Sequence, residues 1–320
     1  MRFLPRLRPW ISVALLSVIL LSACSLAGRQ PPRPNGIALA PDGSIYVMAL
    51  ANHRVVHLAP DGRRLDAFGR LGDRPADIYE GWGTALDVAG NIYLCHIWRD
   101  QEDSIGRESI KVFSPTGRLV REITAPGEDG AEGCYSVRVD DAGRIFAVYN
   151  NTNHLRIFDP QGRLLTTLWG ATGTGPGEFI GLRDVAFDAP RGLLYASDAG
   201  NSRIQQFDLS TTPEGEISAV HRRSFGTYGR DLGELAYPQY LAVDEASGRL
   251  AVGDMANRRI QIFDPEGNAL AELAPPGVDD WQVMGLAFAP DGALLAADAL
   301  NGVIWVFEPD GRLRRMIEVP

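Results

Sequence analysis

Residues 197–204 read SDAGNSRI, and residues 253–260 read GDMANRRI. Both stretches contain an Asp, an Asn three positions later, and then an Arg-Ile pair, which indicates an internal repeat. Copies of the wider pattern follow one another at intervals of 44 to 56 residues, a spacing close to the roughly 40 to 50 residues of a propeller blade. The apolar residues that end the third predicted strand of each copy are Leu58, Phe113, Phe158, Phe207, Phe263 and Phe307.

Each copy contains four short apolar or alternating runs separated by turn residues, which is typical of β-strands. Between the third and fourth runs, residues 158–162 read FDPQG and residues 263–267 read FDPEG. Asp first, Pro second and Gly fourth are the preferences of a type I turn. The 35 Gly and 21 Pro are spread along the chain, as many such turns require. We therefore predict an all-β fold, a six-bladed β-propeller with four-stranded blades.

The repeated stretches resemble the NHL repeat family. Residues 197–204 and 253–260 are similar to the core of that repeat, and GTGPGEF at 173–179 is similar to its inter-repeat loop. The resemblance covers nearly all of residues 34–320 and implies a propeller of the NHL type. Where the family has its Asp, the first three copies carry Ala49, His96 and Tyr149.

The N-terminus has the composition of a secretory signal. Three arginines among the first eight residues precede an apolar run at 10–21, too short for the ~20 residues of a membrane-spanning helix. Residues 21–24 read LSAC, which resembles the lipobox of bacterial lipoprotein precursors. The resemblance implies that residues 1–23 are a signal peptide, that Cys24 is lipidated, and that the protein is anchored in the outer membrane where the host has one.

Residues 24–35 are rich in Pro and polar side chains, so we expect an extended tether between the lipid and a propeller over 36–320. Signal cleavage removes three arginines and no acid, so the net charge falls from −9 to −9 − 3 = −12. An acidic protein repels phosphates, and we therefore expect no nucleic-acid partner.

Two cysteines remain after lipidation of Cys24. Cys95 ends the second predicted strand of blade two, and Cys134 precedes the innermost strand of blade three. Alternating strand directions bring both to the same face of the propeller, and an exported chain meets an oxidising compartment. We therefore expect a disulfide between Cys95 and Cys134.

The sequence contains no convincing catalytic set. The repeated Asp, Asn and Arg side chains are interpreted as loop-stabilising groups, because a catalytic constellation assembles only once. His53 and His57 are the only close histidine pair, and they lie on a predicted strand, so no metal site is expected. We predict no catalytic residue and no cofactor.

Two enzyme classes with similar propellers offer an alternative. A lyase that cleaves peptidyl-hydroxyglycine has zinc-binding histidines before its innermost strands, but no histidine occupies those positions here. The matching positions are Asn35, Trp82, Tyr135, Arg183, Gln239 and Met284. Gluconolactonase-like propellers bind a divalent cation, for which Asn35, Asp184 and Gln239 supply a partial oxygen set. A metal-assisted lactonase or lyase is therefore the alternative function.

The innermost strands, aligned at period two, give two columns of mostly small residues. One column is Gly36, Gly83, Ser136, Asp184, Tyr240 and Gly285, and the other is Ala38, Ala85, Arg138, Ala186, Ala242 and Ala287. The exceptions lie in blades three to five, where Arg138 and Asp184 either plug the axis as an ion pair or contribute to a small-ligand site. The candidate ligand-binding residues are Trp82, His96, Tyr135, Arg138, Arg183, Asp184 and Tyr240.

Together these features predict a lipid-anchored extracytoplasmic propeller that acts as a ligand-binding or protein-binding scaffold. Its expected partners are the membrane, through the N-terminal lipid, and a protein or small molecule that the sequence does not identify. We expect the functional surface on the face that carries the loops between second and third strands, because connections bear function more often than scaffolds do.

Overall fold

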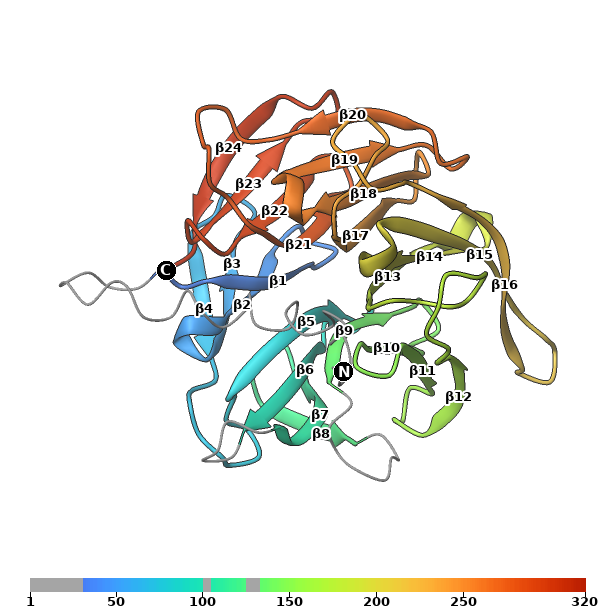
Figure 1. Ribbon diagram of the computed structural model, residues 1–320. Coiled ribbons are helices and arrows are strands. Elements are labelled where there is room, and N and C mark those ends of the chain that lie inside the picture. Colours follow the sequence, from blue (N-terminus) through green and yellow to red (C-terminus); the bar gives the residue numbers. More distant parts are fainter. Residues whose placement is uncertain (1–30, 100–104, 125–132) are drawn as a thin grey trace, which may run out of the picture. The chain divides into compact units, whose positions relative to one another are not determined.

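The computed structural model describes residues 31–99, 105–124 and 133–320. In these ranges each of the six repeats forms one antiparallel sheet of four strands, and the sheets are arranged as blades around a common axis (Figure 1). The predicted all-β, six-bladed propeller is confirmed. No helix in the part of the chain that the structure describes is long and apolar enough to cross a membrane.

The strands run from the axis outward in chain order within every blade. Blades one and two consist of β1 (Pro34–Leu39), β2 (Ile45–Ala49), β3 (Arg54–Leu58), β4 (Arg64–Phe68), β5 (Glu80–Leu86), β6 (Ile92–Arg99), β7 (Ile105–Phe113) and β8 (Leu119–Ile123). Blades three and four consist of β9 (Cys134–Val139), β10 (Ile145–Tyr149), β11 (His154–Phe158), β12 (Leu164–Trp169), β13 (Leu182–Asp188), β14 (Leu193–Asp198), β15 (Arg203–Thr211) and β16 (Ile217–Phe225). Blades five and six consist of β17 (Pro238–Asp244), β18 (Arg249–Asp254), β19 (Arg259–Phe263), β20 (Ala269–Leu273), β21 (Val283–Phe288), β22 (Leu294–Asp298), β23 (Val303–Phe307) and β24 (Leu313–Glu318).

Short 3₁₀ turns join second to third strands or first to second strands in four places. They are η2 (Leu50–Asn52), η3 (Ala189–Arg191), η4 (Ala199–Asn201) and η5 (Met255–Asn257). Three of them therefore lie on the face where the innermost strands begin, and η3 lies on the opposite face.

Small residues in the innermost strands allow the blades to converge. A Cβ atom on Gly83 of β5 would lie 2.6 Å from the Cα of Ser136 in β9, and one on Gly285 of β21 would lie 3.1 Å from the Cα of Gly36 in β1. Larger side chains at these places would collide with backbone that cannot move aside. The small-residue columns read from the sequence are thus explained by close approach of neighbouring inner strands.

Blades one and six meet without sharing a sheet, since β1 to β4 and β21 to β24 are separate and consecutive in their sheets. The outer part of this contact includes Ile317 of β24, which packs where Gly62 leaves room. A guanidinium nitrogen of Arg315 also donates to the carbonyl of Pro60. Closure of the ring therefore relies on side-chain packing and hydrogen bonds between the first and last blades.

The folded unit begins earlier than the predicted boundary at Gly36. Strand β1 starts at Pro34, and the carbonyl of Pro32 accepts a hydrogen bond from the backbone of Ala51 at 3.2 Å. Pro31 packs against Gly302 of blade six. The last residues of the expected tether therefore belong to the propeller, whereas the signal peptide and Cys24 lie outside the described residues.

The repeated turn and the repeated aromatic residue have the roles that the pattern predicts. Gly162 has φ of +85°, and its N–H donates to the carbonyl of Asp159 at 2.9 Å, which closes the turn between β11 and β12. The third-strand residues Leu58, Phe113, Phe158, Phe207, Phe263 and Phe307 are all at most 1% exposed. Full burial of such a side chain contributes roughly 1.5 to 3 kcal/mol, so these positions anchor each blade in the core.

Candidate ligand-binding site at the propeller axis

The repeated aspartates are structural. Asp198, at the end of β14, is fully buried and accepts hydrogen bonds from the backbone N–H of Ile180 at 2.9 Å and from Nε of Arg203 at 2.8 Å. In blade five, Asp254 is equally buried and accepts from Nε of Arg259 at 2.9 Å. Each carboxylate thus ties the loop that enters its blade to the second and third strands, as the recurrence of the set predicts.

His96 has this same structural role in blade two. Its Nε2 accepts a hydrogen bond from the backbone N–H of Tyr79 at 3.1 Å. In blade four, Asp198 accepts the backbone N–H of Ile180 in the same way. The Nζ of Lys111 lies 3.4 Å from the same nitrogen. In blade three the corresponding pair is Tyr149 and Arg156, whose guanidinium carbon lies 4.7 Å from the phenol centroid. His96 was grouped with the candidate ligand residues, and the structure gives it a part in holding the entry loop of its own blade.

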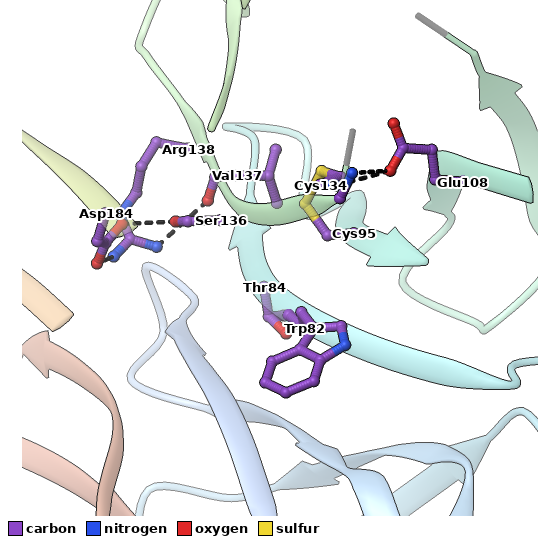
Figure 2. Close-up of a disulfide and its surroundings, with 10 residues drawn as sticks. Trp82, Thr84, Cys95, Glu108, Cys134, Ser136, Val137, Arg138 and Asp184 are labelled. Atoms are coloured by element: carbon purple, nitrogen blue, oxygen red, sulfur yellow. Dashed lines mark hydrogen bonds and ion pairs between the residues drawn. A yellow bond between two sulfur atoms is a disulfide. The ribbon is translucent and has the colours of Figure 1, made fainter. Parts of the chain in front are cut away.

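Arg138 and Asp184 form an ion pair at the axis (Figure 2). An Nη2 to Oδ2 distance of 2.5 Å joins β9 of blade three to β13 of blade four. The other carboxylate oxygen accepts from Oγ of Ser136 at 2.5 Å, and Leu241 of blade five donates its backbone N–H to Oδ2 at 2.9 Å. Because both carboxylate oxygens are engaged, the geometry favours the interpretation that this pair plugs the axis.

The electrostatics of Asp184 agree with a structural role. Burial raises the pKa of this carboxyl group, and the Arg138 guanidinium and the hydrogen bonds from Ser136 and Leu241 oppose that rise. A buried carboxylate with several donors is stabilised in its ionised form only while those donors are present. Asp184 therefore depends on neighbours in blades three and five.

A second group of side chains lies where the innermost strands begin, and we call it the axial cluster. It consists of Trp82, Tyr135, Arg183, Tyr237, Gln239, Tyr240 and Met284. The residues come from blades two to six, and four of them, Tyr135, Arg183, Gln239 and Met284, occupy the second position of the innermost strand. Of the candidate ligand residues, the structure brings together Trp82, Tyr135, Arg183 and Tyr240 in this cluster.

Tyr135 is the centre of the axial cluster. Its ring stacks on Trp82 with centroids 5.2 Å apart and lies 6.3 Å from the ring of Tyr240. Its hydroxyl donates to Oε1 of Gln239 at 2.8 Å and lies 3.1 Å from the hydroxyl of Tyr240. The Tyr240 hydroxyl also lies 3.5 Å from the sulfur of Met284. Side chains from four blades therefore meet at one place, with aromatic rings from three of them.

Both phenols in the centre are neutral over the physiological pH range. Burial raises the pKa of Tyr135, an effect that the neighbouring Arg183 partly opposes. Burial raises the pKa of Tyr240 further, and the hydrogen bond and proximity of Tyr135 add to the rise. Each hydroxyl thus remains available as a hydrogen-bond donor as well as an acceptor.

Arg183 lies between two tyrosine rings. Its guanidinium carbon is 4.9 Å from the centroid of Tyr135 and 5.4 Å from that of Tyr237. An Nη2 nitrogen also donates to the hydroxyl of Tyr237. Cation–π contacts of this kind stabilise a guanidinium without neutralising its charge.

Tyr237 was missed in the sequence, although a signal was present. It has φ of +58°, a left-handed conformation, two positions before Gln239. The equivalent positions are Gly133 and Gly181 in blades three and four, with φ of +71° and +78°, and Arg33 in blade one, with φ of +51°. A bulky residue in this conformation is uncommon, so a tyrosine at a position that is glycine in blades three and four is a signal of a local function.

Two of the three side chains considered for a divalent cation already use their oxygen atoms within the protein. The carboxylate of Asp184 is engaged by Arg138, and Oε1 of Gln239 accepts from Tyr135. The third, Asn35, donates from its side-chain nitrogen to the carbonyl of Gly81 at 3.2 Å, a bond that does not involve its Oδ1. The described ranges also contain no group of three or more His, Cys, Asp or Glu placed to hold a metal ion.

Cys95 of β6 and Cys134 of β9 are joined by a disulfide in the structure (Figure 2). Their Cα atoms lie 5.4 Å apart, and both residues are fully buried. The bond connects blade two to blade three, and the backbone N–H of Cys134 also donates to a carboxylate oxygen of Glu108 at 3.0 Å. These contacts hold the start of β9, from which Tyr135 projects.

The comparisons with known proteins agree with this architecture. A family model described as a 6-bladed beta-propeller matches residues 131–237. The virginiamycin B lyase from Staphylococcus aureus has a similar structure, with a TM-score of 0.59 and 13% identity over 90% of this chain and 85% of that one. A gluconolactonase from Xanthomonas campestris is similar with a TM-score of 0.61 and 17% identity over 84% of each chain. Blade count, topology and these likenesses define a six-bladed β-propeller.

The curated relatives specify the type of propeller. NHL repeat-containing protein 3 of Homo sapiens is 23% identical over 275 residues, which cover 70% of this chain and 77% of that protein. The protein of the same name from Mus musculus matches to the same extent. The chain is an NHL-type six-bladed β-propeller.

Proposed function

We propose that this protein is a lipid-anchored, extracytoplasmic binding protein that recognises its ligand with the axial cluster. The observation that carries the proposal is the meeting of Trp82, Tyr135 and Arg183 from three successive blades at the start of the innermost strands. Aromatic faces with a few convergent polar groups are typical of small-molecule sites. The repeated polar sets, in contrast, are used within the scaffold.

The envelope location rests on the N-terminal sequence. The apolar segment ending in LSAC at 21–24 supports signal cleavage and acylation of Cys24. More than one acyl chain on a residue gives stable anchoring, because each buried methylene contributes ~0.8 kcal/mol. The acidic mature chain makes nucleic acid an unfavourable partner.

A metal-assisted lactonase or lyase is a weaker proposal than binding. The similar lyase and gluconolactonase structures share the fold at low identity, and fold similarity does not transfer chemistry. Of the three candidate metal ligands, Asp184 is paired with Arg138, and Oε1 of Gln239 accepts from Tyr135. Hydrolysis of a lactone that requires an added divalent cation would favour the enzyme over the binding protein.

Two measurements test the proposal. For the anchor, mass spectrometry of the mature N-terminus is expected to find acylated Cys24, and an unmodified terminus elsewhere would disprove the anchor.

For binding, thermal shifts with a defined panel of aromatic and aliphatic acids, amides and alcohols are compared between the wild type and Trp82→Ala. Tyr228→Ala is the control, because Tyr228 is 82% exposed and contacts no member of the axial cluster in the described structure. If no compound distinguishes Trp82→Ala from wild type, the axial cluster is not the binding site.

A further inference from the structure

Arg183 differs from three other partly buried arginines. Arg138, Arg203 and Arg259 each pair with a buried aspartate at distances of 2.5 to 2.9 Å. Among the described residues, Arg183 has no carboxylate partner. Its contacts are the two tyrosine rings and one phenol hydroxyl, which leave its positive charge uncompensated.

Two hydrogen-bond donors in the cluster also lack partners. Nε of Arg183 and Nε1 of Trp82 are buried, and neither has a hydrogen-bond partner in the described structure. Buried donors are nearly always satisfied in folded proteins, so two unsatisfied donors on side chains that both contact Tyr135 call for an explanation. An acceptor supplied from outside the chain would satisfy them.

We propose that the axial cluster binds a small organic acid, with Arg183 receiving its carboxylate and the aromatic rings receiving an adjacent flat apolar group. This inference rests on the proposed binding function and specifies the ligand class. A guanidinium matches a carboxylate in shape and donates to both of its oxygens. Trp82 and Tyr135 provide the apolar surface beside it, with ring centroids 5.2 Å apart and ring planes inclined by 26°.

The charge balance favours a monoanion over a phosphate dianion. Arg183 supplies one positive charge, and the second axial arginine, Arg138, is already paired with Asp184. A dianion would therefore bring one charge that no protein group neutralises, into a site whose phenols are neutral and whose protein is acidic overall. A carboxylate is neutralised by Arg183 alone.

The test is isothermal titration of the mature full-length protein in detergent with matched probes. Benzoate, cinnamate and indole-3-acetate are compared with their uncharged amides and with inorganic phosphate. We expect at least one acid to bind with a dissociation constant of about 1 mM or tighter and at least tenfold more tightly than its amide and than phosphate. If no acid binds more tightly than its amide, or if phosphate binds best, the proposal is overturned.

Variants assign the effect to the guanidinium. Arg183→Met is expected to reduce affinity for that acid at least tenfold, while Arg183→Lys retains part of it. Arg222→Met is the matched control, because Arg222 lies on the outer strand β16 of the same blade and pairs with Asp208 at the surface. Unchanged affinity in Arg183→Met, or an equal loss in Arg222→Met, contradicts the assignment.

The same titrations separate this inference from the proposed function. If acids and amides bind equally and both lose affinity in Trp82→Ala, the axial cluster is a binding site but not one for anions. If neither class loses affinity in Trp82→Ala, the proposed site itself is wrong.

Discussion

Nη2 of Arg138 lies 2.5 Å from Oδ2 of Asp184 and also donates to the carbonyl of Leu241 at 3.1 Å. One guanidinium thereby connects the innermost strands of blades three, four and five. Arg183, on the same strand as Asp184, has aromatic contacts in place of an acid. The two axial arginines therefore differ in their contacts, and mutations can test the proposal that Arg138 serves stability and Arg183 serves recognition.

Arg138→Met should destabilise the propeller by about 3 to 5 kcal/mol, because it leaves the carboxylate of Asp184 buried without its counter-ion. Urea denaturation followed by tryptophan fluorescence measures the loss. The double variant Arg138→Met/Asp184→Asn should recover part of it, since the uncompensated charge is then absent. If the free energy of unfolding of Arg138→Met lies within about 1 kcal/mol of the wild-type value, the ion pair does not stabilise the contact between the blades.

Reduction of the Cys95–Cys134 bond should also lower stability. The bond closes a loop with a sequence separation of 39, for which the loss of chain entropy in the unfolded state corresponds to about 4 kcal/mol. Denaturation of Cys95→Ala/Cys134→Ala against wild type measures the effect. Alkylation of the denatured protein without reductant should label neither cysteine, and complete labelling of both would refute the bond.

Acid should destabilise the fold through its turns. A backbone hydrogen bond from Arg163 lowers the pKa of Asp159, and one from Arg312 lowers that of Asp310. Because the folded pKa lies below the ordinary value of about 4, each carboxylate contributes stability above that pH and loses it as pH falls through the folded pKa.

Thermal unfolding between about pH 5 and pH 2 measures this dependence. The double variant Asp159→Asn/Asp310→Asn should lose less stability over that interval than wild type, because its turns carry no titrating group. Equal slopes for the two proteins would mean that other groups cause the acid lability.

The fold was predictable because the same local sequence features recur in each blade. The turn at 158–162, the buried third-strand residues such as Phe158, and the small residues of the inner strands each recur and each have one local cause. The domain start was placed too late, at Gly36. Pro32 joins blade one through a backbone carbonyl, and a backbone contact leaves no pattern in the sequence.

The candidate site was only partly predictable. Period-two alignment found Tyr240 and the Arg138–Asp184 pair, because breaks in a column of small residues are visible. His96 broke the repeat for a different reason, since an imidazole nitrogen can accept the same backbone N–H as the usual carboxylate. Tyr237 lies in a loop outside any strand periodicity, and only comparison with the glycines of other blades would have found it.

Tyr237→Gly should separate binding from stability. Glycine adopts the left-handed conformation of this position without the cost of roughly 1 to 2 kcal/mol that other residues incur. That gain is offset by the lost contacts of the ring and by the greater freedom of glycine in the unfolded chain. We therefore expect the free energy of unfolding to change by no more than about 1 kcal/mol.

The same substitution removes the ring on one side of Arg183, so affinity for the organic acid should fall about threefold or more, as expected for one cation–π contact. Urea denaturation and titration with the same acid measure the two effects, and Tyr228→Gly controls for loss of an exposed loop tyrosine. If stability falls sharply while affinity is unchanged, Tyr237 supports the fold and not the site.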